Sequence, residues 1–250
     1  MKEHLYLYIL GIADNTLILG QRLGELCGHG PNLETDIACT NLSLDLFGQT
    51  RSYYQYAATL KGDGITEDSI AFLRNERNYT NTLLVEQPNT DFAFVMARQF
   101  LFDIYHVLFL EALTNSQDET LAAIATKSLK EVLYHQRFST DWVKRLGDGT
   151  ALSKEKMQKA VDEMWKYTDE LFHQTEADKA MIKEGVGVNV LLLKEEYYKR
   201  VSQILGEATI EVPTEKWFQR GGKFGIHSEH LGYILSDLQY MQRTYPNMKW

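Results

Sequence analysis

The fold is indicated most directly by the stretch Lys130-Glu131-Val132-Leu133-Tyr134-His135-Gln136-Arg137-Phe138, which lies within a long helix-like run. His135 falls where its side chain would face the inside of a helical bundle. In bundles that hold two metal ions between their helices, a Glu-x-x-His pair on each of two helices supplies part of the ligand set. Here the residue three before His135 is Val132, whose side chain cannot bind a metal. The stretch therefore predicts a bundle in which one ligand position has been lost.

A second gap occurs at Asp45-Leu46-Phe47-Gly48, where an acid is present but the histidine three residues later is missing. The surrounding helix is predicted over residues 33–60, and its buried stripe is expected to contain Ile37, Asn41, Leu44, Gly48 and Ser52. Asp45 would lie on or beside this stripe, where a carboxylate requires a partner. We favour an arginine, a lysine or hydrogen bonds over a metal ion. The two gaps predict a di-iron-type bundle that has lost its metal site and serves a partner protein.

The remaining chain is also predicted to be helical, because four prolines in 250 residues leave long uninterrupted stretches. Further helices are expected over residues 4–28, 66–72, 91–114, 117–146, 176–184, 190–207 and 228–243, with another running from Ser153 to about Leu171. Side chains expected to cap helices are those of Asn32, Ser116, Ser153 and Ser228. Residues 75–85 are expected to be irregular. No repeat or composition break divides the chain, so we predict one all-α domain over residues 1–250.

Composition limits the classes of function. A formal charge of −8 and a pI near 5.4 argue against nucleic-acid binding, which needs a clustered positive surface. Cys27 and Cys39 are too few for a disulfide scaffold, so a cytoplasmic location is expected. We also expect no signal peptide, no apolar run long enough to span a bilayer and no association with a membrane.

Three other groups of residues could carry chemistry. Asp103-Ile104-Tyr105-His106 has intact acid-x-x-His spacing on a predicted inner face, but a buried Asp–His hydrogen-bonded pair is the favoured interpretation. Glu131 and His135 are four residues apart and are interpreted as a helix-surface pair. His227-Ser228-Glu229-His230 is interpreted as a helix start, because the further ligands that a zinc site needs are absent.

Several separate motifs occur in an order that resembles a known family. They are Gln21-Arg22-Leu23-Gly24-Glu25-x-Cys27-Gly28-His29, Asn41-x-x-Leu44-Asp45-Leu46-x-Gly48-Gln49, Val85-Glu86-Gln87-Pro88-Asn89, Lys130-Glu131-x-x-Tyr134-His135-x-Arg137-Phe138 and Gly221-Gly222-Lys223-x-Gly225-x-His227-x-Glu229-His230-Leu231-Gly232. Over nearly its whole length the chain resembles the non-catalytic large subunit of bacterial ring-1,2-phenylacetyl-CoA epoxidases.

This resemblance implies a ferritin-like four-helix bundle with additional helices, acting in aerobic phenylacetate catabolism. It implies a structural subunit that binds a homologous di-iron catalytic subunit, together with a small bridging subunit and a reductase carrying flavin and iron–sulfur groups and using NADPH. Asp45, Asp103 and His135 would be remnants of a lost metal site, and Gln21 is the nearest candidate for the ligand of the first helix. The chain itself would hold no metal and no catalytic residue.

The resemblance also implies that the subunit closes part of the channel for phenylacetyl-CoA. The residues expected at that edge are Asn78, Tyr79, Thr80, Asn81, Lys179, Ala180 and Met181. Two alternatives remain: an autonomous di-metal oxidoreductase that uses Asp103, His106, His135 and Glu131, or a free-standing CoA-ester-binding protein.

Overall fold

The computed structural model describes residues 1–214, 216–246 and 248, and no strand occurs among them. The long helices are α1 (Lys2–Gly24), α2 (Leu33–Lys61), α4 (Phe92–Leu113), α5 (Glu119–Gly147) and α6 (Ala151–Trp165). The later helices are α7 (Glu176–Lys183), α8 (Lys194–Glu207) and α9 (Glu229–Thr244), and α3 (Glu67–Phe72) is a short early one. Single 3₁₀ turns occur at η1 (Glu76–Asn78), η2 (Asp169–Phe172), η3 (Val190–Leu193) and η4 (Gly222–Phe224). The all-helical architecture confirms the predicted fold class and fits a ferritin-like bundle.

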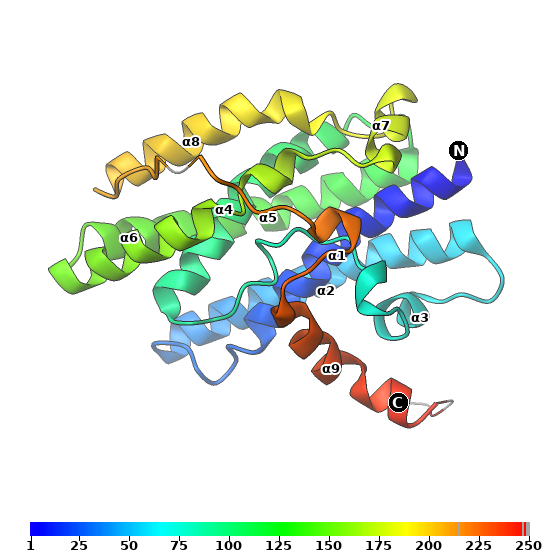
Figure 1. Cartoon of the computed structure of the whole chain (residues 1–250), viewed down its shortest axis with the longest axis horizontal. Helices are drawn as coiled ribbons and strands as arrows, with labels where there is room; N and C mark the ends of the chain where they lie inside the picture. Colours follow the sequence, from blue (N-terminus) through cyan, green and yellow to red (C-terminus); the bar gives the residue numbers. More distant parts are fainter. Residues whose placement is uncertain (215, 247, 249–250) are drawn as a thin grey trace.

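The helices pack in two neighbouring groups, and Figure 1 shows α1 and α2 lying along one another while α5 and α6 follow α4. Helix α8 covers the far side of α4 and α5, and α9 projects away from the body of the molecule with the C-terminal end. The N-terminal end of α1 lies beside α7.

The predicted cap residues are partly correct. Asn32 caps α2 by accepting a hydrogen bond from the Thr35 amide, as expected. The expected caps of α5 and α6 are wrong: Asp118 caps α5, while Thr150 caps α6 and Ser153 completes its capping box from inside the helix. In each case two residues suited to capping lie within three positions of one another, and local spacing does not select between them.

Helix α4 lies at the centre of the fold and is buried on nearly all sides rather than along one stripe. It packs against α5, α6, α8 and η3. By length and composition alone it could cross a membrane, so the expectation that no apolar run is long enough was wrong. The apolar window is entirely buried within the protein, which accounts for its composition without a bilayer.

The predicted buried stripe of α2 was also wrong, because the residues that carry it face outward. Of the predicted stripe, Ile37 and Leu44 are 50% and 61% exposed, and Asn41 and Gly48 are exposed as well. Leu33, which was not part of that stripe, is 70% exposed. The face that packs on α1 carries instead Cys39, Leu42, Leu46, Tyr53 and Tyr54. We call the exposed apolar residues Leu33, Ile37 and Leu44 the α2 outer face. Helix α2 thus has two apolar faces, one of which remains uncovered in the isolated chain.

The irregular segment between α3 and α4 is held to α1 by a buried acid. Arg74 donates to both carboxylate oxygens of Asp14, at 2.5 and 3.0 Å. Tyr54 donates its hydroxyl to the same carboxylate, and the Thr80 amide donates at 2.8 Å. The segment is irregular as predicted, and side chains from distant parts of the chain supply its hydrogen bonds.

Candidate functional site

The predicted remnants of a metal site lie where α2, α4 and α5 meet. Asp103 is fully buried on α4 and accepts hydrogen bonds from Gln99 Nε2 and Ser139 Oγ, each at 2.7 Å. Burial raises the pKa of Asp103 to about 7, although the nearby His135 and these two hydrogen bonds act in the opposite direction. Its predicted hydrogen-bonded partner was His106, but Gln99 and Ser139 take that role. Asp103 is therefore a core carboxyl satisfied by neutral groups.

His135 joins α5 to α2. Its Nε2 lies 3.0 Å from Asp45 Oδ2, so the His135–Glu131 surface pair predicted from spacing was wrong. The His135 side chain is fully buried, whereas Asp45 is partly exposed rather than buried. Glu131 instead accepts a hydrogen bond from Gln49 Nε2 at 3.0 Å. The partner that Asp45 was expected to need is this histidine, not an arginine or lysine.

The side chains around this junction do not fit a pair of metal ions. Val132 is fully buried at the position three before His135, and Gly48 is exposed instead of facing the core. Gln21, on α1, is only partly buried. Among the described residues, no three His, Cys, Asp or Glu side chains gather closely enough to hold a metal ion. Because the remaining acids already accept hydrogen bonds or pair with histidine, the junction supports packing rather than metal chemistry.

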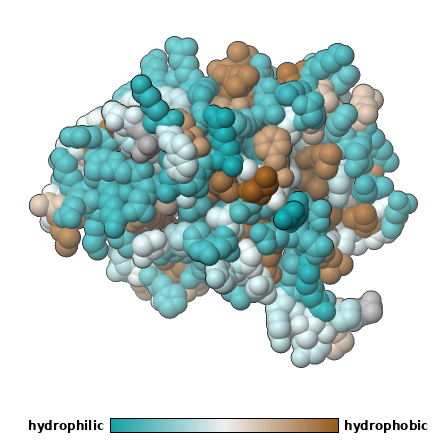
Figure 2. Space-filling model, in the orientation of Figure 1, coloured by the Kyte–Doolittle hydropathy of each residue, from teal (hydrophilic) through white to brown (hydrophobic). Residues whose placement is uncertain are grey.

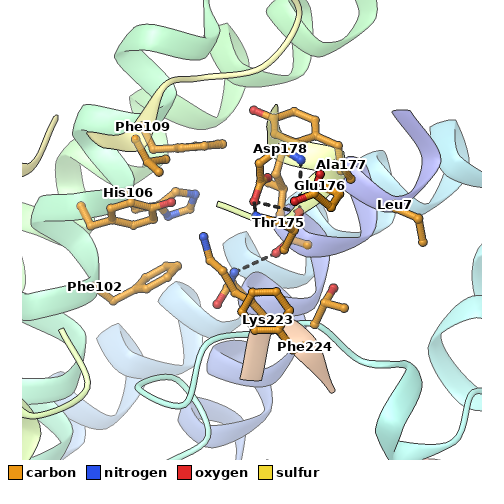
Figure 3. Close-up of a pocket in the computed structure, with 17 residues that line it drawn as sticks. Leu7, Phe102, His106, Phe109, Thr175, Glu176, Ala177, Asp178, Lys223 and Phe224 are labelled. Carbon is orange, nitrogen blue, oxygen red and sulfur yellow. Dashed lines mark hydrogen bonds between the residues drawn. The ribbon is translucent and has the colours of Figure 1, made fainter. Parts of the chain in front are cut away.

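A cavity of about 330 Å³ lies beside this junction, between α4, α1 and the start of α7. Figure 3 shows His106 directed into it from α4, flanked by Phe102 and Phe109. His106 is 2% exposed, and neither ring nitrogen has a hydrogen-bond partner among the described residues. Burial, aided by the nearby His135, lowers the pKa of His106 to about 3. The imidazole is therefore neutral at physiological pH and faces the cavity unpaired.

Other polar groups enter the cavity from the later part of the chain. Lys223 of η4 donates its ammonium to the His173 carbonyl at 2.7 Å, and burial lowers the pKa of this lysine. Asp178 of α7 accepts hydrogen bonds from the Thr175 amide and hydroxyl. Tyr105 lines the wall, and burial raises the pKa of its hydroxyl.

The loop that presents Lys223 is fixed by a buried carboxylate. Glu170 Oε1 accepts from the Gly221 amide at 2.7 Å, and Oε2 accepts from the Leu83 amide at 2.7 Å. A Cβ on Gly222 would overlap the Asn81 carbonyl oxygen, so only glycine allows this close approach. The Gly-Gly-Lys sequence thus places Lys223 against the segment that follows α3.

The structure separates the residues predicted at the edge of a CoA channel. Thr80 lines the cavity, whereas Tyr79 and Asn81 are fully buried and Asn78 is exposed. In α7 the cavity is lined by the first turn, Thr175 to Asp178, and not by the predicted Lys179, Ala180 and Met181. Lys179 is exposed and paired with Glu176 at 2.7 Å. The contact of all seven residues with a CoA ester stays a prediction.

Sequence reasoning missed most of the cavity. Leu7, Tyr8 and Asp178 carry no motif, and their approach to His106 depends on packing between distant segments. The Gly221-Gly222-Lys223 loop belongs to one of the motifs that carry the family resemblance, and that was the available signal for Lys223. His106 was noticed for its spacing to Asp103 rather than for a cavity.

The fold and this junction define a ferritin-like helical protein in which, over the described part of the chain, no three His, Cys, Asp or Glu side chains are gathered for a metal ion. The chain belongs to the family described as phenylacetic acid catabolic protein, which it matches over residues 1–250. It is 48% identical over 243 residues to a subunit of the 1,2-phenylacetyl-CoA epoxidase of Escherichia coli (strain K12). That alignment covers 97% of this chain and 98% of the relative. The resemblance predicted from the motifs is confirmed.

Proposed function

We propose that this chain is the structural, non-catalytic subunit of a phenylacetyl-CoA epoxidase complex in phenylacetate catabolism. The observation that carries the proposal is the fully buried Val132 at a ligand position, beside an Asp103 that is already satisfied by Gln99 and Ser139. Oxygen chemistry would then belong to a homologous di-iron subunit, and a reductase with flavin and iron–sulfur groups would supply electrons from NADPH. A small bridging subunit completes the proposed assembly, which we place in the cytoplasm.

The surface that best suits the catalytic partner is the α2 outer face together with the exposed side of α5. Leu33, Ile37 and Leu44 lie within about 40° of one another around α2, since each residue advances about 100° around a helix. Leu133 and Tyr134 are exposed on α5, which contacts α2 through the His135–Asp45 pair. Exposed apolar residues gathered on adjoining helices are typical of an interface between subunits.

Co-expression with the di-iron subunit tests the proposal. We expect a stable complex, and we expect Leu44→Glu to weaken it about thirtyfold, the effect of losing a contact worth about 2 kcal/mol at the centre of an interface. Affinity between the purified subunits provides the measurement. Leu192→Glu is the matched control, because Leu192 is also exposed but lies on η3, and it should change the affinity less than threefold.

One result would contradict the proposed role, and another would contradict the proposed interface. A chain that stays monomeric beside the di-iron subunit would refute the structural role. An equal loss of affinity in the Leu44→Glu and Leu192→Glu variants would leave the role intact but place the interface elsewhere.

A further inference from the structure

The cavity beside α4 has mostly apolar walls, but the polar side chain of His106 faces into it. His106 is buried, neutral and unpaired, although an unsatisfied polar group in a protein interior costs about 1–3 kcal/mol. Figure 3 shows its ring facing the open space and not the protein core behind it. A hydrogen-bonding group inside the cavity would remove this cost. Either water or a ligand could supply that group, and the rest of the cavity distinguishes between them.

The walls favour an aromatic occupant over water alone. Phe102, Tyr105 and Phe109 project from successive turns of α4, and Ile12 and Val190 close the cavity from other elements. Faces of aromatic rings provide offset and edge-to-face contacts for another ring, whereas they offer water no hydrogen bond. We propose that this cavity binds a compact, uncharged molecule with one aromatic ring and one oxygen, whose oxygen pairs with His106 and whose ring lies among the α4 aromatic residues.

The charges near the cavity support an uncharged occupant. The charged side chains that line the cavity are those of Lys223, Asp178 and Glu176, and Lys223 already donates to the His173 carbonyl. The carboxyl groups of Asp178 and Glu176 lie on the same wall and are unfavourable neighbours for the carboxylate of a ligand. Bringing an additional ion out of water costs several kcal/mol unless it is fully paired. A hydroxyl or carbonyl oxygen can form hydrogen bonds in the cavity without the cost of taking an ion out of water.

The size and entrance of the cavity restrict the ligand further. About 330 Å³ lies at the lower end of the range for small-molecule sites, about 300–1,000 Å³. Coenzyme A is too large for it and would bring several phosphates to a site with one lysine. Leu7 and Phe224 line the cavity and are both partly exposed, which gives it an apolar mouth. Figure 2 shows hydrophobic residues gathered near the middle of the face on which η4 lies in Figure 1.

Calorimetry on the full chain tests the proposal with three probes of similar size: 2-phenylethanol, toluene and phenylacetate. We expect 2-phenylethanol to bind with one-to-one stoichiometry. Phenylacetate should bind at least tenfold more weakly because of its charge, and toluene about tenfold more weakly because it lacks the oxygen. Failure of 2-phenylethanol to bind would mean that the cavity holds water only, and tighter binding of phenylacetate would overturn the assignment of an uncharged ligand.

Two variants locate the binding within the cavity. His106→Leu should weaken 2-phenylethanol about tenfold and toluene less than threefold, whereas His29→Leu, at an exposed histidine, should change neither. Gly11→Leu should abolish binding of every probe, because a Cβ at Gly11 would stand 3.8 Å from Thr80 Oγ1 with room to fill the cavity. Unfolding temperatures report whether each variant is folded. Unchanged binding in a folded Gly11→Leu variant would contradict the proposal. The proposal does not depend on assembly with other subunits.

Discussion

The Val132→Glu variant is expected to lose about 4 kcal/mol of folding free energy at pH 7 and to bind no iron. Val132 is fully buried one turn from His135, so the substitution restores the acid-x-x-His spacing of a metal-binding bundle. The new carboxyl group must either carry its charge into the core or take up a proton. Protonating a glutamate at pH 7, about 2.7 units above its ordinary pKa of about 4.3, costs about 3.7 kcal/mol at 1.36 kcal/mol per unit.

The dependence on pH separates this cause from a simple packing defect. When a carboxyl has a higher pKa in the folded state than in the unfolded state, the folded protein becomes less stable as the pH rises above the unfolded pKa. The loss of folding free energy in Val132→Glu should therefore grow between pH 4.5 and pH 7. Chemical denaturation at several pH values, with iron analysis of the purified variant, provides the measurements. Leu133→Glu is the control, because the neighbouring side chain is exposed and should cost less than 1 kcal/mol. A Val132→Glu variant of normal stability that carries stoichiometric iron would show that the metal site persists, and would favour the autonomous metalloenzyme.

Local signals in the sequence predicted where the helices lie. Asn32 caps α2 as expected, and α4 begins where a helix was expected, with Asp91 as its cap; such caps act over only two or three residues. Residues 210–213 lie outside any helix, because Pro213 keeps the residue before it out of the helical region. The expected cap at Ser228 was only half right: Ser228 is the N-cap residue, but its side chain makes no capping hydrogen bond, and its amide donates to Glu86 Oε1 at 2.7 Å. That partner is 142 residues away and has no local signature.

The face on which a helix packs was harder to predict. Helix α2 has apolar residues on two sides, and periodicity alone does not show which side meets α1 and which side meets another chain. The uncovered side was therefore assigned to the core. The error is informative, because this uncovered apolar side is the α2 outer face, through which the chain is proposed to bind its partner subunit.

The candidate site was predicted only in part, again because the sequence does not show which way each side chain of a helix points. The acid-x-x-His spacing identified the correct helix, but residues three apart differ by about 60° around its axis. Asp103 consequently turns toward Ser139 on α5, whereas His106 turns toward the cavity beside α1 and α7. Lys223 reaches the same cavity only through a loop held by Glu170. Contacts of this kind, between residues far apart in the sequence, can be identified only from the tertiary structure.

The Glu86→Gln variant is expected to lose about 3–5 kcal/mol, the cost of breaking a buried charge pair. The Glu86 carboxylate accepts hydrogen bonds from Asn81 Nδ2 at 3.0 Å and the Ser228 amide at 2.7 Å, and lies 2.9 Å from His227 Nδ1. The side chains of Glu86 and His227 are both fully buried. A glutamine amide would point one N–H group at another donor and would leave His227 without a countercharge. Glu163→Gln, which removes an exposed carboxylate paired with Lys159, should cost less than about 1 kcal/mol.

The pH profile of Glu86→Gln should identify His227 as the partner. Burial alone would lower the pKa of His227, but the hydrogen bond and charge of Glu86, with the Tyr79 carbonyl, raise it above its ordinary 6.5. A histidine with a raised folded pKa contributes stability that is complete below the unfolded pKa and is lost as the pH rises through the folded value. The deficit of Glu86→Gln relative to the parent chain should therefore be largest at pH 6 and smaller at pH 9. A deficit that does not change over this range would mean that Glu86 acts through its hydrogen bonds to Asn81 and Ser228 alone, with His227 neutral throughout.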